Sequence, residues 1–355
     1  MLQVLTIVIM VILPQAVQTA RMGGLLRGGA GPDRPRRWGV RLGTMRMGGV
    51  SLGPTQLDSG YCFRLADGQG WHIIATEGVR PWVEKLASIM QLKTCEPNGF
   101  LKRIFIQRES REINCEYPLP PRDENILEHL PRIGWIAHNL GALQIWSHQD
   151  VPDVICEIGP DDDDILEILR MRLALHPIYQ QAQDAGGLPV HAALVERRRQ
   201  GALLIGDGGA GKSTCCLRLP APWGILCDDE VLIIPDGERG YFAHPFPTWS
   251  DYILKRSERT WNVEKHVALS AIFFLEQAKI DEVVPTRQGQ AAVLLSKSSA
   301  QVCRQIWIDL VDEEKRRLRR RAFENACGLA KVIPAFKLRV SLDGRFWEEM
   351  EKVLH

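Results

Sequence analysis

The strongest constraint on this chain is a glycine-rich segment, residues 206–213, with the sequence Gly-Asp-Gly-Gly-Ala-Gly-Lys-Ser. An apolar stretch at residues 202–205 precedes it, and residues 212–219 have the composition of a short helix. This strand–loop–helix context is the one that the pattern Gly-x-x-x-x-Gly-Lys-Ser requires. Backbone amides in such a loop converge on phosphate oxygens, and the helix N-terminus adds partial positive charge. The segment therefore predicts a nucleoside triphosphate site, with ATP and Mg²⁺ as the expected ligands.

Each residue type in this loop has an expected task. The Lys212 ammonium would neutralise the β- and γ-phosphates, and the Ser213 hydroxyl would bind Mg²⁺. The glycines leave no Cβ between the backbone amides and the phosphates. The residues expected to contact the nucleotide are Gly206, Asp207, Gly208, Gly209, Ala210, Gly211, Lys212, Ser213 and Thr214.

The segment after the loop limits the sheet topology. Pro220 and Pro222 end the short helix, and an apolar strand is expected at residues 223–227. A second apolar stretch, residues 231–234, follows almost at once. Because so short a connection leaves no room for a crossover helix, we expect an antiparallel or mixed sheet.

Two carboxylates, Asp228 and Asp229, stand between these strands, 16 and 17 residues after Lys212. Beside a phosphate site, one could accept the proton of an attacking hydroxyl and the other could hold Mg²⁺ or its waters. The alternative is a structural Asx turn between two strands.

The order of His191, the glycine loop and the aspartate pair resembles the C-terminal domain of HPr kinase/phosphorylase, as do the apolar residues 268–276. The resemblance covers residues 186–310. It implies the ATP-binding core shared with phosphoenolpyruvate carboxykinases, of α/β class with α+β character. By the same resemblance Asp228 is the general base, and Asp229 supports the metal together with Ser213.

The resemblance also implies that His191 orients a carboxylate or contacts phosphate, whereas a lone strand histidine is otherwise mostly structural. Residues 61–68 and 243–250 are more narrowly similar to SynChlorMet cassette protein C, encoded beside radical-SAM and peptide-carrier proteins. The glycine-rich strand that carries a metal-binding glutamate in true HPr kinases is missing. Residues 242–250 take its place, which puts HPr as a substrate and the phosphorylase reaction in doubt.

Further polar residues follow the aspartate pair, and each has an ordinary structural alternative. One group could line an acceptor site or pack around two prolines: His244, Thr248, Trp249 and Ser250. Another could close over the phosphates or be surface charge: Lys255, Arg256 and Arg259. The basic run at residues 315–321 would be a solvated helix face or would meet an acidic partner.

We expect four parts in the chain. Residues 1–55 would be a leader, 56–185 an N-terminal α+β domain, 186–310 the ATP-binding domain and 311–355 a C-terminal helical segment. The N-terminal domain would contain a β-hairpin, a helix and further strands, at residues 61–75, 82–92, 101–107, 134–138, 142–147 and 154–158. Four aspartates, residues 161–164, open an apolar-periodic stretch as an acidic first helical turn or as a metal site.

The leader has three interpretations. Residues 2–13 are apolar and have the length of a signal-peptide core, but no Lys or Arg precedes them. The Gly- and Arg-rich residues 21–54 show no periodicity, which is typical of disorder. The third possibility is a mis-assigned start, with translation beginning near Met45 or Met47.

The net charge of +1 gives no general attraction to nucleic acid or to an anionic membrane. Nine cysteines occur without a Cys-x-x-Cys pair, which favours reduced thiols in a cytoplasmic protein. The expected function is an ATP-dependent kinase that phosphorylates Ser or Thr of a small protein or ribosomal peptide. The alternatives are a non-catalytic, ATP-gated peptide-binding module and a small-molecule kinase. An oligomer would fit the resemblance.

Overall fold

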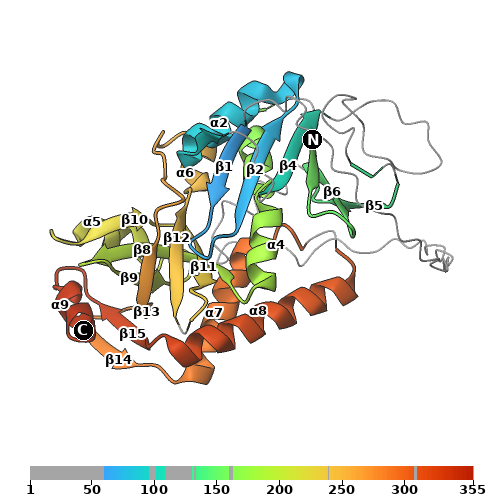
Figure 1. Cartoon of the computed structure of the whole chain (residues 1–355). Coiled ribbons are helices and arrows are strands. Elements are labelled where there is room, and N and C mark those ends of the chain that lie inside the picture. The colour runs from blue at the N-terminus through green and yellow to red at the C-terminus, as the bar shows by residue number, and fades with distance from the viewer. Residues whose placement is uncertain are drawn as a thin grey trace, which may run out of the picture. The chain divides into compact units, whose positions relative to one another are not determined.

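Two mixed sheets form the framework of the fold, and helices pack against them (Figure 1). The computed structural model describes residues 60–95, 101–108, 130–131, 133–159, 163–238, 240–307 and 310–354. These belong to one compact unit, residues 58–355. The expected α+β character is confirmed. The expected leader, residues 1–55, lies outside the described residues.

The first sheet has the strand order β3-β1-β2-β4-β7-β6-β5. The predicted hairpin is present, with Tyr61 opposite Ile73 across β1 and β2. Helix α2 (Arg80–Met90) buries the predicted apolar face, including Trp82 and Leu86. The strands are β1 (Gly60–Arg64), β2 (Gly70–Ala75), β3 (Lys93–Cys95), β4 (Lys102–Arg108), β5 (Trp135–Asn139), β6 (Leu143–His148) and β7 (Val154–Ile158).

Two helices connect the sheets where the sequence predicted one. Helix α3 (Asp164–Leu173) begins as expected, because the Asp163 side chain accepts a hydrogen bond from the Ile165 amide and caps its N-terminus. Helix α4 (His176–Asp184) follows, with a proline in its first turn where no amide partner is needed. Asp161 and Asp162 of the acidic run lie outside the described residues.

The second sheet contains a closed circuit of five strands, because β8, β9, β13, β12 and β11 each pair with the next and β11 pairs back to β8. Strands β9, β13 and β15 run parallel, and the other pairs are antiparallel, so the predicted mixed sheet is confirmed. The strands are β8 (Leu188–Arg197), β9 (Gln200–Ile205), β10 (Gly224–Cys227), β11 (Glu230–Pro235), β12 (Tyr241–Phe246), β13 (Val267–Gln277), β14 (Glu282–Pro285) and β15 (Ala335–Val340).

The other helices are α5 (Lys212–Arg218), α6 (Trp249–Ile253), α7 (Gln288–Cys303), α8 (Asp312–Val332) and α9 (Phe346–Glu351). Residues from α5 and α9 pack on Leu204 and Phe273 in the core of the second sheet. The helical segment expected at residues 311–355 contains α8 and α9 but also a strand. After α8 the chain returns to the sheet as β15, where Leu338 is fully buried.

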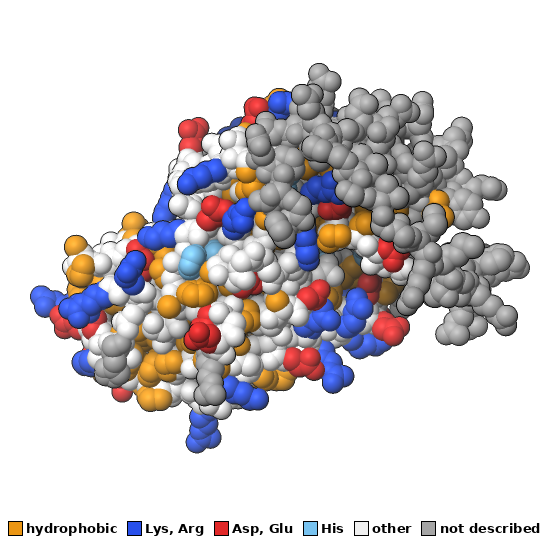
Figure 2. All heavy atoms as spheres, viewed as in Figure 1, with side chains coloured by type: hydrophobic (Ala, Val, Ile, Leu, Met, Phe, Trp, Pro, Cys, Tyr) orange, Lys and Arg blue, Asp and Glu red, His pale blue; other side chains and the backbone are white. Residues whose placement is uncertain are grey.

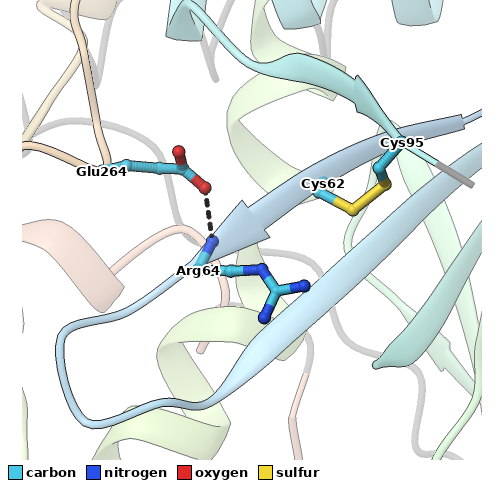
Figure 3. The surroundings of a disulfide bond; sticks show 4 residues. All are labelled: Cys62, Arg64, Cys95 and Glu264. Carbon is cyan, nitrogen blue, oxygen red and sulfur yellow. Dashed lines mark hydrogen bonds between the residues drawn. A yellow bond between two sulfur atoms is a disulfide. The ribbon is translucent and has the colours of Figure 1, made fainter. Parts of the chain in front are cut away.

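A disulfide joins Cys62 of β1 to Cys95 of β3 (Figure 3). The expectation of reduced thiols is therefore wrong for this pair, which are 33 residues apart in sequence and meet only because β1 and β3 are neighbours. The other cysteines of the described segments are free. Within the same segments, no helix has the length and apolar character that crossing a bilayer requires.

Candidate functional site

The glycine loop lies where the sequence placed it, between the end of β9 at Ile205 and the start of α5 at Lys212. Gly209 and Gly211 have φ values of 81° and 103°, in the left-handed region that favours glycine. A Cβ added at Gly208, Gly209 or Gly211 would meet no atom within 4 Å. The backbone of the loop therefore borders open space, and an anion could approach it without displacing a side chain.

The Lys212 side chain folds back across this loop and donates a hydrogen bond to the Gly206 carbonyl oxygen at 2.7 Å. Lys212 is only 8% exposed. Burial lowers the pKa of its ammonium, while the nearby carboxylates of Asp229, Asp207 and Asp228 act in the opposite direction. The lysine thus lies within the electrostatic reach of all three aspartates. Ser213 and Thr214 are exposed on the first turn of α5.

The aspartate pair lies close to the loop because of the strand register. Strands β10 and β11 pair in succession along β8, with Cys227 opposite Leu194 and Glu230 opposite His191. The Ala192 amide of β8 donates to the Asp229 carbonyl at 3.0 Å. On its other side Ala192 pairs with Ile205, the last residue of β9. Two strand spacings, about 10 Å, therefore separate the backbone of the aspartates from the loop entry.

His191 is held on Asp229. Its Nδ1 is 3.0 Å from the Asp229 carboxylate and 2.9 Å from the Asp229 carbonyl oxygen. Since both neighbours are acceptors, Nδ1 carries the proton. Burial would raise the pKa of Asp229, but the hydrogen bond from His191 and the charges of His191, Arg172 and Lys212 outweigh it and leave that pKa lowered. Asp229 is therefore held as a carboxylate.

Asp228 has a different partner. The Thr248 hydroxyl, buried just before α6, donates to Asp228 Oδ1 at 2.7 Å. This contact follows from the register of β11 and β12, where Glu230 lies opposite Phe246. The hydrogen bond fixes one carboxylate oxygen and leaves Oδ2 for another partner. Thr248, predicted for an acceptor site, is thus brought to the predicted base.

Glu230, the residue after the aspartate pair, is buried and anchors the turn between β10 and β11. Its carboxylate accepts a hydrogen bond from the Tyr179 hydroxyl, and Arg172 lies 3.3 Å from its other oxygen. Burial raises the pKa of Glu230, and the charge of Arg172 opposes the rise. Removing either partner would leave the buried carboxylate incompletely paired and would strongly destabilise the fold. These contacts therefore fix the backbone that carries the two aspartates.

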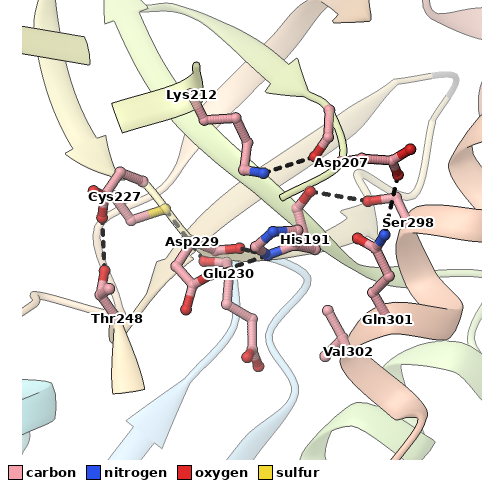
Figure 4. A network of polar contacts seen from close by, with 12 residues as sticks. His191, Asp207, Lys212, Cys227, Asp229, Glu230, Thr248, Ser298, Gln301 and Val302 are labelled. Carbon is pink, nitrogen blue, oxygen red and sulfur yellow. Dashed lines mark hydrogen bonds and ion pairs between the residues drawn. The ribbon is translucent and has the colours of Figure 1, made fainter. Parts of the chain in front are cut away.

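Helix α7 contacts both the glycine loop and the strand that carries His191 (Figure 4). Lys297 lies 2.9 Å from Asp207 of the loop, and Gln301 donates to the same carboxylate at 3.3 Å. Between them the buried Ser298 donates to the His191 carbonyl oxygen at 3.0 Å. From β13, Gln277 donates to the Gly209 carbonyl oxygen at 2.9 Å.

Other predicted residues have structural roles. His244 is fully buried, its two ring nitrogens bind backbone groups of two other segments, and its ring lies 5.2 Å from that of His266, so it does not line an acceptor site. Trp249 is buried as well. Lys255 forms an exposed ion pair with Asp164 at the start of α3. Arg259 lies over the ring of Trp261. Its positive charge also acts to lower the pKa of Cys216 in α5, so it lies within electrostatic reach of that helix.

Among the described residues, no three His, Cys, Asp or Glu side chains are grouped closely enough to hold a metal ion. The predicted Mg²⁺ site would therefore combine the Ser213 hydroxyl and Asp229 with phosphate oxygens and water. This donor set suits Mg²⁺, which usually keeps several waters and binds few protein ligands.

Sequence reasoning missed the residues that support the site. Lys297 and Gln301 are four residues apart, so they share a helix face, but nothing in the pattern says which loop that face meets. Arg172 and Tyr179 lay in a stretch assigned to another domain. Only Glu230 carried a signal, because it directly follows the aspartate pair.

The fold and the site define an α+β protein in which a glycine loop between strand and helix lies beside a supported aspartate pair. The sequence profile of SynChlorMet cassette protein ScmC matches residues 154–355, which include the whole second sheet and every site residue described above. The chain belongs to this family. A comparison with curated proteins gave no match.

Proposed function

We propose that the chain is an ATP-dependent kinase, of the kind that HPr kinases represent, acting on a Ser or Thr hydroxyl of a small protein or ribosomal peptide. The supporting observation is the arrangement of Asp228 and Asp229 two strand spacings from the loop entry, with the buried Lys212 in the field of both. Phosphoryl transfer needs these parts: a phosphate cradle, a cation, and carboxylates for a proton and a metal.

In this proposal the acceptor hydroxyl attacks the γ-phosphorus of ATP, the bond to the β–γ bridging oxygen breaks, and ADP leaves. The proton of the hydroxyl passes to Asp228, whose Oδ2 is left for it because Thr248 occupies Oδ1. Mg²⁺, when bound, would offset charge on the phosphates. Asp229, held ionised by His191, would ligate the metal or its waters. Lys212 would leave the Gly206 carbonyl for the phosphates.

The family name also bears on partners and setting. We expect a cassette protein to act with other products of its cassette. The resemblance of residues 61–68 and 243–250 adds radical-SAM and peptide-carrier proteins as partners, and a peptide made there as the substrate. We place this activity in the cytoplasm, where ATP is available. Figure 2 shows Lys, Arg, Asp and Glu side chains interspersed over the visible face, which gives no support for a nucleic-acid partner.

The test is single-turnover transfer from γ-labelled ATP to cassette peptides. Asp228→Asn should bind ATP normally but transfer phosphate about 10²- to 10⁴-fold more slowly, because an amide cannot take the proton. Asp236→Asn is the matched control, since Asp236 only accepts amide hydrogen bonds in the turn at the far end of β11. Transfer at the wild-type rate by Asp228→Asn would show that the carboxylate is structural.

The alternative functions give other outcomes in the same assay. An ATP-gated peptide-binding module would bind ATP and peptide without transferring label. A small-molecule kinase would transfer label with no peptide present.

A further inference from the structure

The phosphate loop contains a carboxylate of its own, which should disfavour the ligand it is proposed to bind. Asp207 directly follows Gly206, and its side chain is 61% exposed. An ionised aspartate in such a loop repels a triphosphate. A sequence that keeps this residue therefore needs a way to offset its charge.

Helix α7 supplies a positive charge that offsets the charge of Asp207. The Lys297 ammonium lies 2.9 Å from Asp207 Oδ2, and the Gln301 amide donates to Oδ1 at 3.3 Å. The hydrogen bond from Lys297 is the largest influence on the pKa of Asp207, which is lowered. Asp207 is thus one member of an ion pair with Lys297 and not an isolated anion.

Helix α7 is fixed where it delivers this lysine. Ser298, only 4% exposed, donates to the His191 carbonyl oxygen at 3.0 Å. Arg172 donates to the Val302 carbonyl one turn later and lies against Glu230. The turn of α7 that meets the loop is therefore attached to the strand of His191 and to the support of the aspartate pair.

We propose that Lys297 is a positioning residue for nucleotide binding: it neutralises Asp207 so that the glycine loop can accept a polyphosphate. This inference rests on the proposed nucleotide site. It does not rest on the stability of the ion pair, because exposed pairs of this kind stabilise a fold little. Its effect falls on the ligand, whose several negative charges share the loop with Asp207.

The expected size follows from Coulomb's law. At separations near the Debye length of about 8 Å, one unprotected charge acting on three or four phosphate charges changes affinity by roughly 3- to 10-fold. The effect should grow with the charge of the ligand. ATP should lose the most, ADP less and AMP least, which a general distortion of the loop would not reproduce.

The experiment measures ATP, ADP and AMP affinity of the full chain by calorimetry with Mg²⁺, for Lys297→Met, Asp207→Asn and the double variant. Lys297→Met should weaken ATP about 3- to 10-fold. Asp207→Asn should tighten ATP by a comparable factor, since Lys297 is then free to act on the phosphates. The double variant should regain most of the affinity lost by Lys297→Met, because the repelling charge is gone.

Lys265→Met is the matched control. Lys265 is about as exposed as Lys297 and forms an ion pair with Glu196, near the end of β9 opposite the glycine loop, and its loss should leave ATP affinity unchanged. Equal losses for all three nucleotides, no rescue by Asp207→Asn, or no loss at all would each overturn the inference. Absence of ATP binding by the unaltered chain would instead show that the proposed nucleotide site is wrong.

Discussion

Two histidines lie on strands of the second sheet, in surroundings that differ in almost every respect. His191 on β8 is partly buried, and its Nδ1 donates to Asp229 beside the glycine loop. His244 on β12 is fully buried. Its Nε2 accepts from the Ala66 amide at 3.1 Å, and its Nδ1 donates to the Val263 carbonyl at 2.9 Å. The first histidine acts on a carboxylate, whereas the second joins the β1–β2 hairpin to the second sheet.

The difference separates two regions of the molecule. Around His244 the polar groups link the sheets, as in the Glu264 carboxylate that accepts from the Arg64 amide at 2.9 Å. Around His191 the polar groups gather beside the open side of a loop. We therefore expect substitutions near His191 to change nucleotide chemistry with little loss of stability. Substitutions near His244 should do the reverse.

The largest effect is expected at Lys212. Lys212→Ala should weaken ATP binding about 10²- to 10⁴-fold, because the charge-assisted hydrogen bonds expected from its ammonium to the β- and γ-phosphates are lost. The free energy of unfolding should change little, since a buried ammonium with a lowered pKa contributes little to stability. Calorimetric titration with ATP and Mg²⁺, beside thermal unfolding, measures both. Unchanged ATP affinity would remove the site assignment, and with it the contrast between the regions.

The disulfide gives the corresponding prediction for the region that does not contain the nucleotide site. Cys62→Ala with Cys95→Ala should lower the free energy of unfolding by about 3.7 kcal/mol, as expected for opening a closed loop of this length. ATP affinity should not change. Denaturant unfolding with and without reductant gives the value, and the unbridged chain should be indifferent to reductant. A loss of ATP affinity equal to that of Lys212→Ala would mean that the two regions are not separate.

The glycine loop and its flanking strand and helix could be predicted because their pattern is local. The aspartate pair was located for the same reason, and the mixed sheet followed from the short connection through Pro220 and Pro222. What could not be predicted depends on distant segments meeting. The role of His244 requires Ala66 and Val263, the disulfide requires β1 beside β3, and Lys297 requires α7 beside the loop.

The pH dependence of stability should report on His244. Burial lowers the pKa of His244 from 6.5 to about 4. The folded state therefore binds this proton less readily than the unfolded chain. The contribution is complete above pH 6.5 and is lost as the pH falls toward 4. The loss amounts to about 3 kcal/mol.

His244→Gln keeps an amide that can accept from Ala66, and it should flatten this part of the profile. His176, whose pKa is also lowered to about 4, remains in the variant and contributes in the same window. The measurement is denaturant unfolding between pH 4 and pH 7 for both proteins. Identical slopes would show that His244 does not carry the pH dependence.

The smallest effect is expected at His191, and it tests the other half of the contrast. His191→Ala removes the hydrogen bond that holds Asp229, which should slow phosphoryl transfer about 5-fold, the equivalent of about 1 kcal/mol. His191→Asn should recover most of this rate, because its amide can donate from nearly the position of Nδ1. The Mg²⁺ concentration for half-maximal transfer should rise in the alanine variant and return in the asparagine variant. A purely structural His191 would instead lower stability in both variants and leave the Mg²⁺ dependence where it was.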